Sequence, residues 1–169
     1  MEVIKLINNN HGKTAFSFEL LPPLKGNSIK QVFNVIDRLK EFDPKYINIT
    51  THHSENVFIE RKDGTYQKRN IRKRPGSVAI AAAIQNKYNI TAVPHIISKG
   101  FTKQETEYAL FDLSFLGVHD LLLLRGDSSK LDADQLSMDS HKYSTGLQEQ
   151  VNKFNNGISF DNSSFEAPD

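Results

Sequence analysis

The stretch SVAIAAAIQNKYNITAVPHI, residues 77–96, decides the fold class. Its first part, Ser77–Tyr88, has the apolar pattern of a helix and directly follows Pro75-Gly76. Its second part, Ile90–Ile96, is a short run of apolar and β-branched residues that is typical of a strand. A helix followed so closely by a strand is one step of an alternating α/β chain.

The same alternation continues on both sides of this stretch. Further strands are predicted at Thr14–Leu20, Tyr46–Thr51 and Leu121–Leu124. Further helices are predicted from Ser28 to Asp43, from Thr102 to Gly117 and over Lys142–Phe154. The order β-α-β-α-β-α-β-α predicts parallel strands with right-handed crossovers, either in an open doubly wound sheet or in part of a (βα)8 TIM barrel. A whole barrel needs about 250 residues, so residues 1–169 are expected to form a single domain of about four βα units.

Four local features are also expected. Capping boxes are predicted at Ser28–Gln31 and Thr102–Glu105, where two side chains three residues apart satisfy each other's backbone amides. Leu121–Leu124 is wholly apolar, which indicates burial on both faces. Residues 52–76 are interpreted as a long basic loop, and residues 155–169 as an irregular tail.

The composition excludes several classes of protein. With 21 Lys and Arg, 20 Asp and Glu and a net charge of +1, the chain does not resemble a polybasic nucleic-acid binder. It has no cysteine, which excludes disulfides and thiolate zinc sites, and the adjacent pair His52-His53 does not favour a metal site. No apolar run suits a membrane helix, and the start is too polar for a signal peptide, so a cytoplasmic location is expected.

Polar or small residues stand where each predicted strand ends. They are Glu19, Thr50-Thr51, His95 and Arg125-Gly126-Asp127. Ligands bind at the carboxyl ends of the strands in both candidate architectures, so together these residues indicate a site. Taken singly, each has a structural alternative: a solvated strand end, a strand-forming threonine, a core histidine or an ion pair that shapes a turn. The chain has no phosphate-binding P-loop, no Rossmann fingerprint and no nucleophile elbow.

The segment 60–74 is rich in lysine and arginine. A solvated loop is one interpretation, and a landing site for phosphates or for a polyanionic substrate tail is another. Nucleic-acid binding is a third, which only Tyr66 would support by stacking.

Five motifs in order resemble the 5,10-methylenetetrahydrofolate reductase family. They are FSFELLPP (residues 16–23), NITT (48–51), VPHI (93–96), GFTKQETEYAL (100–110) and LLLLRGD (121–127). The resemblance implies a (βα)8 barrel, of which this chain supplies about the first four units. It also implies that FAD binds at the carboxyl ends of the strands. The implied reaction transfers hydride from NADH or NADPH, through FAD, to methylenetetrahydrofolate. The product is 5-methyltetrahydrofolate, which serves one-carbon metabolism and methionine biosynthesis.

The resemblance also implies roles for single residues. Glu19 resembles the catalytic acid of the family, and Asp127 is implied to lie near the flavin and the pterin. The implied FAD contacts are Thr50, Thr51, His95, Arg125, Gly126, Asp127, Tyr143 and Ser144. No metal, nucleic acid or membrane is implied, and a homo-oligomer is expected, since a half-barrel leaves strand edges open.

Three alternatives remain open at this point. The chain could belong to another flavin-dependent TIM-barrel oxidoreductase, such as the proline dehydrogenase-like relatives. It could be a non-catalytic half-barrel that acts by association, or a nucleic-acid binder that uses its basic segment.

Overall fold

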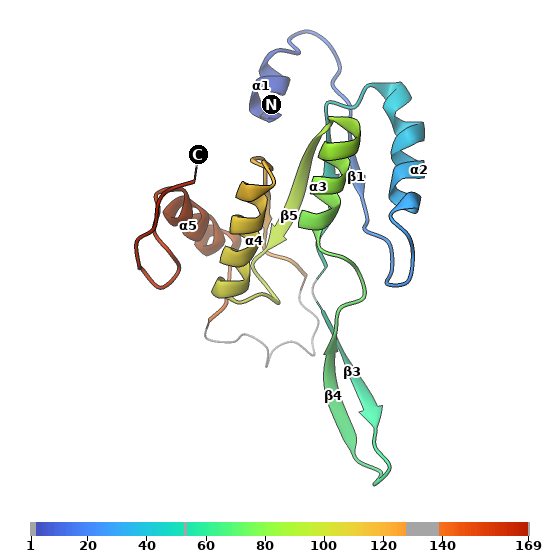
Figure 1. Cartoon of the computed structure of the whole chain (residues 1–169), viewed down its shortest axis with the longest axis vertical. Coiled ribbons are helices and arrows are strands. Elements are labelled where there is room, and N and C mark those ends of the chain that lie inside the picture. Colours follow the sequence, from blue (N-terminus) through green and yellow to red (C-terminus); the bar gives the residue numbers. More distant parts are fainter. Residues whose placement is uncertain (1–2, 53, 128–138, 169) are drawn as a thin grey trace.

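The computed structural model describes residues 3–52, 54–127 and 139–168 (Figure 1). The helices and strands, in chain order, are α1 (Val3–Asn8), β1 (Ser17–Leu20), α2 (Lys30–Leu39), the 3-10 helix η1 (Lys40–Phe42), β2 (Tyr46–Ile49), β3 (Glu55–Glu60), β4 (Tyr66–Ile71), α3 (Ser77–Tyr88), β5 (Thr91–Ile97), α4 (Lys103–Phe115), β6 (Leu122–Leu124) and α5 (Ser144–Asn155). No helix in these ranges is long and apolar enough to cross a lipid bilayer.

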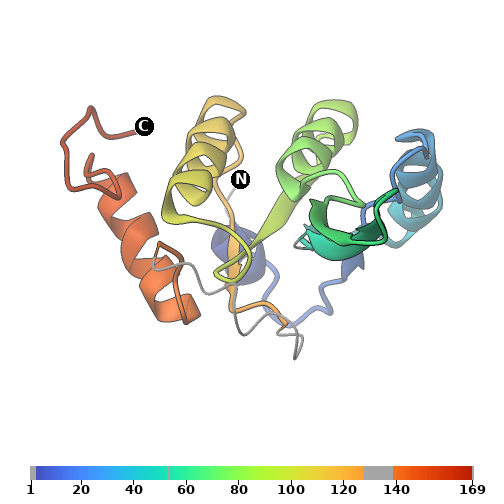
Figure 2. The same ribbon diagram turned by 90° about the horizontal axis from the view of Figure 1, so that it is seen from below.

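The main sheet has four parallel strands in the order β1-β2-β5-β6. This confirms that the four strands predicted from the sequence are parallel, and it places them side by side in chain order. Helices α2 to α5 form an arc on one side of it (Figure 2). The protein therefore has an α/β fold with a parallel sheet, an arrangement consistent with part of a TIM barrel.

The core lies between the sheet and these helices. Alternate strand residues point toward the helices and pack against their apolar faces. The largest fully buried apolar side chains are Ile36, Ile47, Ile49, Ile84, Leu113 and Leu147. The opposite face of the sheet carries no such helix layer in the described chain, and it presents the residues considered below.

Of the two predicted capping boxes, one is confirmed and one is wrong. Thr102 Oγ1 accepts from the Glu105 amide, and the Glu105 carboxylate accepts from the Thr102 amide. At the start of α2, the Ser28 hydroxyl accepts from the Lys30 amide instead. The Gln31 side chain donates to Asn27 Oδ1, so it does not reach back to Ser28 and no box closes.

The prediction that Leu121–Leu124 is buried on both faces is wrong. Leu122 and Leu124 are 39% and 37% exposed. In the described chain β6 pairs only with β5, so it is an edge strand. Leu123 packs against the core, whereas Leu122 and Leu124 share the face of His95 and point away from the helices.

The interpretation of residues 52–76 as a loop is also wrong, because this segment contains an antiparallel hairpin of β3 and β4 that projects from the body (Figure 1). Its turn is built on Asp63-Gly64. Gly64 adopts a φ of 80°, which glycine tolerates best. The Asp63 carboxylate accepts from the Thr65 amide and hydroxyl at 3.0 and 2.6 Å, and these bonds lower the pKa of Asp63.

Both ends of the described chain are attached to the body. Helix α1, which the sequence analysis did not predict, is linked to the body by a hydrogen bond from the Val3 amide to Asp120 Oδ1. The C-terminal tail is largely irregular, as expected, apart from a bridge between Ile158 and Ser164. Buried Glu107 of α4 accepts from the Ser159 hydroxyl and from the Phe160 amide, both at 2.7 Å, and so holds the tail in place.

Candidate functional site

Strand register places Glu19 on the sheet face that the helices leave uncovered. Glu19 pairs in register with Asn48, and Asn48 with Val93, so these three side chains share a face. His95 lies two residues beyond Val93 on β5 and therefore points the same way. The adjacent Leu20 and Ile49 are buried among the helices. The alternation of β1 and β5 thus aims a carboxylate and an imidazole at one site.

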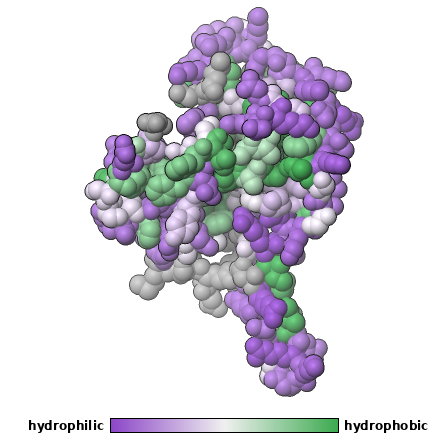
Figure 3. Space-filling model, viewed as in Figure 1, coloured by the Kyte–Doolittle hydropathy of each residue, from purple (hydrophilic) through white to green (hydrophobic). Residues whose placement is uncertain are grey.

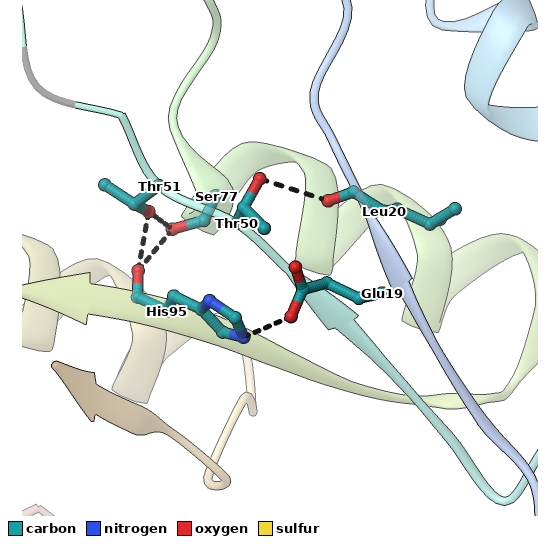
Figure 4. Close-up of polar contacts among 6 residues, drawn as sticks. All are labelled: Glu19, Leu20, Thr50, Thr51, Ser77 and His95. Atoms are coloured by element: carbon teal, nitrogen blue, oxygen red, sulfur yellow. Dashed lines mark hydrogen bonds and ion pairs between the residues drawn. The ribbon is translucent and has the colours of Figure 1, made fainter. Parts of the chain in front are cut away.

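Glu19 and His95 meet across β2 (Figure 4). His95 Nε2 lies 3.9 Å from Glu19 Oε2; the imidazole side chain is 5% exposed and the carboxylate side chain 60% exposed. Nε2 is buried and has no hydrogen-bond partner among the described residues. A buried polar atom without a partner is costly in a native structure, so this nitrogen is available for a ligand at the site.

The environment of His95 lowers the pKa of its imidazole. Burial removes water from the ring and disfavours the charged form, which is the larger effect. The nearby Glu19 carboxylate acts in the opposite direction and raises the pKa. His95 is therefore held mainly neutral at physiological pH, with its charge state coupled to Glu19.

Two hydroxyl groups fix the backbone at His95. Thr51 Oγ1 and Ser77 Oγ lie 2.6 and 3.0 Å from the His95 carbonyl oxygen, and 2.6 Å from each other. Ser77 is buried at the start of α3, and the sequence analysis missed it. Its position directly after Pro75-Gly76, at the carboxyl edge of the sheet, was the available signal. The Thr51 hydroxyl thus serves the protein backbone here.

Thr50 extends the pairing of β1 and β2 beyond the last strand residue. Its amide donates to the Leu20 carbonyl at 3.0 Å, and its hydroxyl lies 3.4 Å from the same oxygen. The side chain is half-buried at the carboxyl edge.

The segment after β6 is fixed to β5. The Arg125 carbonyl accepts from the Ser98 hydroxyl and the Lys99 amide, both at 3.1 Å. Gly126 has a φ of 79°, and a Cβ there would lie 3.3 Å from the Cβ of Ile97, so the backbone approaches β5 at a position suited to glycine.

Arg125 and Tyr143 are brought together although they are far apart in the sequence. The guanidinium lies over the tyrosine ring at 5.3 Å from its centroid. Tyr143 immediately precedes α5, and Ser144 is the first residue of that helix. Asp127 is exposed, and within the described chain it makes no ion pair with His95. The structure therefore brings together Glu19 with His95, and Arg125 with Tyr143.

A comparison with protein-family models identifies the chain. The model for methylenetetrahydrofolate reductase matches residues 4–163. The chain belongs to the methylenetetrahydrofolate reductase family. This result confirms the resemblance inferred from the sequence motifs, and the matched range includes every residue proposed above for the site.

Curated relatives carry the same name. The chain is 30% identical over 115 residues to 5,10-methylenetetrahydrofolate reductase of Buchnera aphidicola, covering 68% of this chain and 34% of the relative. It is 24% identical over 116 residues to 5,10-methylenetetrahydrofolate reductase of Salmonella typhimurium, covering 69% and 34%. It is 26% identical over 129 residues to methylenetetrahydrofolate reductase (NADH) 1 of Arabidopsis thaliana, covering 75% and 19%. The matches thus span about a third of the length of these bacterial reductases and about a fifth of the plant enzyme.

Metal ligands do not gather at the site. Among the described residues, no three His, Cys, Asp or Glu side chains lie close enough together to hold a metal ion. Of the adjacent histidines considered in the sequence, His53 lies outside the described residues.

Proposed function

We propose that this chain contributes the first four βα units of a TIM-barrel reductase that converts 5,10-methylenetetrahydrofolate to 5-methyltetrahydrofolate with NADH or NADPH. The observation that carries this proposal is the pair Glu19 and His95 on the uncovered sheet face of a family member. An exposed carboxylate beside a buried imidazole can hold and deliver a proton, which this reduction needs.

The residues at the carboxyl edge fit FAD as the cofactor. The buried Nε2 of His95 lacks a partner among the described residues and can bond to a polar ligand atom. Gly126 keeps the backbone there free of a side chain. Together with Thr50, Thr51, Arg125, Asp127, Tyr143 and Ser144, these residues would hold the flavin. When bound, FAD accepts hydride from NAD(P)H and supplies it to the folate.

Glu19 is proposed as the general acid. The methylene bridge of the substrate must open before its carbon can accept hydride, and protonation of the departing folate nitrogen makes opening possible. Substrate bound over the sheet would cover Glu19 and exclude water from its carboxyl group. His95 lies beside this carboxylate, on a backbone that Thr51 and Ser77 fix.

Asp127 is proposed to place a negative charge beside the flavin and the pterin. A negative charge there disfavours further negative charge on the bound groups. The proposal also includes a cytoplasmic location and assembly as a homo-oligomer, with no nucleic acid or membrane as partner.

The experiment that tests this proposal compares two electron acceptors. The reductase that contains these four units, supplied with FAD, is assayed for NADH oxidation with methylenetetrahydrofolate and, separately, with the quinone menadione. Glu19→Gln is expected to lower the folate-dependent rate at least about a hundredfold, the range of general acid catalysis, and to spare the menadione rate. Glu41→Gln, on exposed η1, is the matched control.

The outcomes separate the alternatives. Folate-dependent oxidation that forms 5-methyltetrahydrofolate supports the proposal. Menadione reduction without any response to folate would indicate another flavin-dependent oxidoreductase. Equal rates for Glu19→Gln and wild type with both acceptors would place the acid elsewhere.

A further inference from the structure

The β3–β4 hairpin projects away from the body and is held in that direction at its base. There the Arg74 guanidinium donates to the Pro22 carbonyl, and the Lys25 amide donates to the Lys73 carbonyl at 2.7 Å. The two strands then extend beyond the carboxyl edge of the sheet (Figure 1). A protein surface that covers the outer part of the hairpin therefore belongs to another molecule.

One face of the hairpin carries both apolar and charged side chains. Register places Phe58 opposite Lys68. It places Glu60 opposite Tyr66, two residues nearer the turn, so all four side chains share this face. The two aromatic side chains are 61% and 66% exposed, and in the described chain the two exposed charges form no ion pair. An isolated two-stranded hairpin is marginally stable in water, so burial of this face against a partner would stabilise it.

A groove between α3 and α4 offers a surface of suitable size. Its volume is about 480 Å³, within the range of roughly 300–1,000 Å³ that is typical of ligand pockets. Val78, Ala79 and Ala109 contribute to its apolar lining, and Leu116, the C-terminal cap of α4, lies at the end away from the hairpin. Figure 3 shows apolar surface both on the hairpin and over these helices.

The groove also carries charges of both signs. Glu105 and Asp112 lie along α4, and Arg72 lies beside Gly76 at the base of the hairpin. Among the described residues, Asp112 and Arg72 form no ion pair. The two parts of the chain also differ in charge. Residues 1–103 contain 17 Lys or Arg and eight Asp or Glu, whereas residues 104–169 contain four and twelve. The basic part of one copy therefore attracts the acidic part of another.

We propose that the hairpin of one copy of this chain docks in the α3–α4 groove of a second copy, at the end nearest the second copy's own hairpin. Phe58 and Tyr66 are then buried against the apolar lining. Lys68 faces Asp112, and Glu60 faces Arg72. Because each copy offers both a hairpin and a groove, a twofold dimer makes this contact twice. The inference rests on the homo-oligomer of the proposed function and specifies its interface.

This docking would connect assembly to the candidate site. Thr51 and Ser77 line the groove, and their hydroxyl oxygens lie 2.6 and 3.0 Å from the His95 carbonyl oxygen. A hairpin in the groove would shield these two hydroxyls from water and strengthen their hold on the backbone at His95.

Directed cross-linking tests the proposal, because the chain has no cysteine of its own. The whole chain with Tyr66→Cys on the hairpin is mixed at micromolar concentration with an isotope-labelled chain that carries Ala79→Cys in the groove, and the mixture is oxidised with diamide. Mass spectrometry measures the mixed disulfide. In the control, Asn86→Cys, exposed on the same helix but outside the groove, replaces Ala79→Cys. The hairpin–groove disulfide is expected to exceed the control about tenfold, since docking raises the effective concentration of the two thiols.

Charge reversal tests the pairing of Lys68 with Asp112. Lys68→Glu in the hairpin protein, or Asp112→Lys in the groove protein, is expected to lower the yield of mixed disulfide a few-fold, the range of an exposed ion pair. Both changes together should restore it. Lys30→Glu, which reverses an exposed charge on α2, should leave the yield unchanged.

The remaining outcomes would overturn the proposal. Equal yields with Ala79→Cys and Asn86→Cys would indicate random collision, and failure of the double reversal to restore the yield would refute the charge pairing. Loss of the hairpin–groove disulfide in Leu122→Lys/Leu124→Lys would place the association at the β6 edge instead. None of these measurements uses folate or FAD, so a negative result leaves the reductase assignment intact, and a failed folate assay leaves this interface intact.

Discussion

His95 Nε2 and Glu19 Oε2 lie 3.9 Å apart although their strands, β5 and β1, are separated by β2. The two side chains reach each other because both stand on the uncovered face at the carboxyl edge. This contact couples the charge of a buried imidazole to an exposed carboxylate, and it can be measured without any ligand.

Removing the carboxylate charge should lower the pKa of His95 further. Burial already lowers this pKa, and Glu19 opposes that effect, so Glu19→Gln leaves burial unopposed. Titration of the imidazole by NMR checks the direction of the change. Glu41→Gln should leave the His95 pKa unchanged, and an equal pKa in Glu19→Gln and wild type would show that the two groups do not interact.

The lowered pKa of His95 also predicts a pH dependence of stability. In the unfolded chain the imidazole titrates near its ordinary pKa of about 6.5. At pH values between this pKa and the lower pKa of the folded protein, the unfolded state binds more protons than the folded state. The free energy of unfolding therefore falls as the pH falls through this range. The slope contributed by one group is at most about 1.4 kcal/mol per pH unit. Urea unfolding of wild type and His95→Gln measures it, and parallel pH profiles for the two proteins would contradict the prediction.

Ser77→Ala should destabilise the protein by about 1–3 kcal/mol, because it removes a buried hydroxyl that bonds to Thr51 and to the His95 carbonyl. Thr145→Ala, at an exposed position on α5, serves as the control. The free energy of unfolding in urea is the measurement. Equal stability of the two variants would mean that the hydroxyl pair does not fix this part of β5.

Gly126→Ala tests the close approach of the backbone to Ile97. The substitution adds a residue with positive φ, which costs about 1–3 kcal/mol, together with a 3.3 Å contact to the Ile97 Cβ. Gly12 has nearly the same φ, 76° against 79°, but no atom lies within 4 Å of its added Cβ. Gly126→Ala should therefore lower the free energy of unfolding more than Gly12→Ala, and an equal loss would assign the whole effect to backbone conformation.

The 169-residue chain by itself should self-associate through the edge at β6. Its Leu122 and Leu124 side chains are partly exposed beside a strand edge that is unpaired in the described chain, and such edges pair readily with other chains. Sedimentation velocity should show a smaller species for Leu122→Lys/Leu124→Lys than for wild type. Phe115→Lys/Leu116→Lys, which changes exposed apolar residues on α4 and at its C-terminal end, should behave as wild type. A monomeric wild-type chain would contradict this prediction.

The fold was predictable where local signals agreed with tertiary structure. Ser77–Tyr88 forms a helix with the predicted bounds, and Thr102 caps its helix as expected. At the start of α2, the Asn27 side chain accepts a hydrogen bond from the side-chain amide of Gln31. The three-residue spacing of Ser28 and Gln31 does not reveal that Asn27 competes for this amide.

Two other differences have identifiable causes. Asp63-Gly64 between alternating residues is a hairpin signal, but the many charges around it favoured a loop interpretation. Leu122 and Leu124 have the composition of a buried strand, yet β6 is at the sheet edge, and strand order is not encoded in a four-residue run.

Strand ends predicted most of the candidate site, because parallel strands bring their carboxyl ends to one edge. That logic identified Glu19 and His95, which the structure places together. It could not identify Ser77, whose importance comes from a hydrogen bond to a backbone carbonyl. Nor could it predict that Arg125 packs over Tyr143, since that contact depends on where α5 begins.

Along β1 and β5, successive side chains point to opposite faces of the sheet, so core packing constrains one set of residues and ligand binding constrains the other. Leu20 and Ile96 belong to the apolar core, whereas Glu19 and His95 face the opposite side. Substitutions on that side can alter which ligand is accepted without disturbing the packing that keeps the chain folded. Descendants of such a sequence can therefore change specificity one residue at a time while passing through folded intermediates.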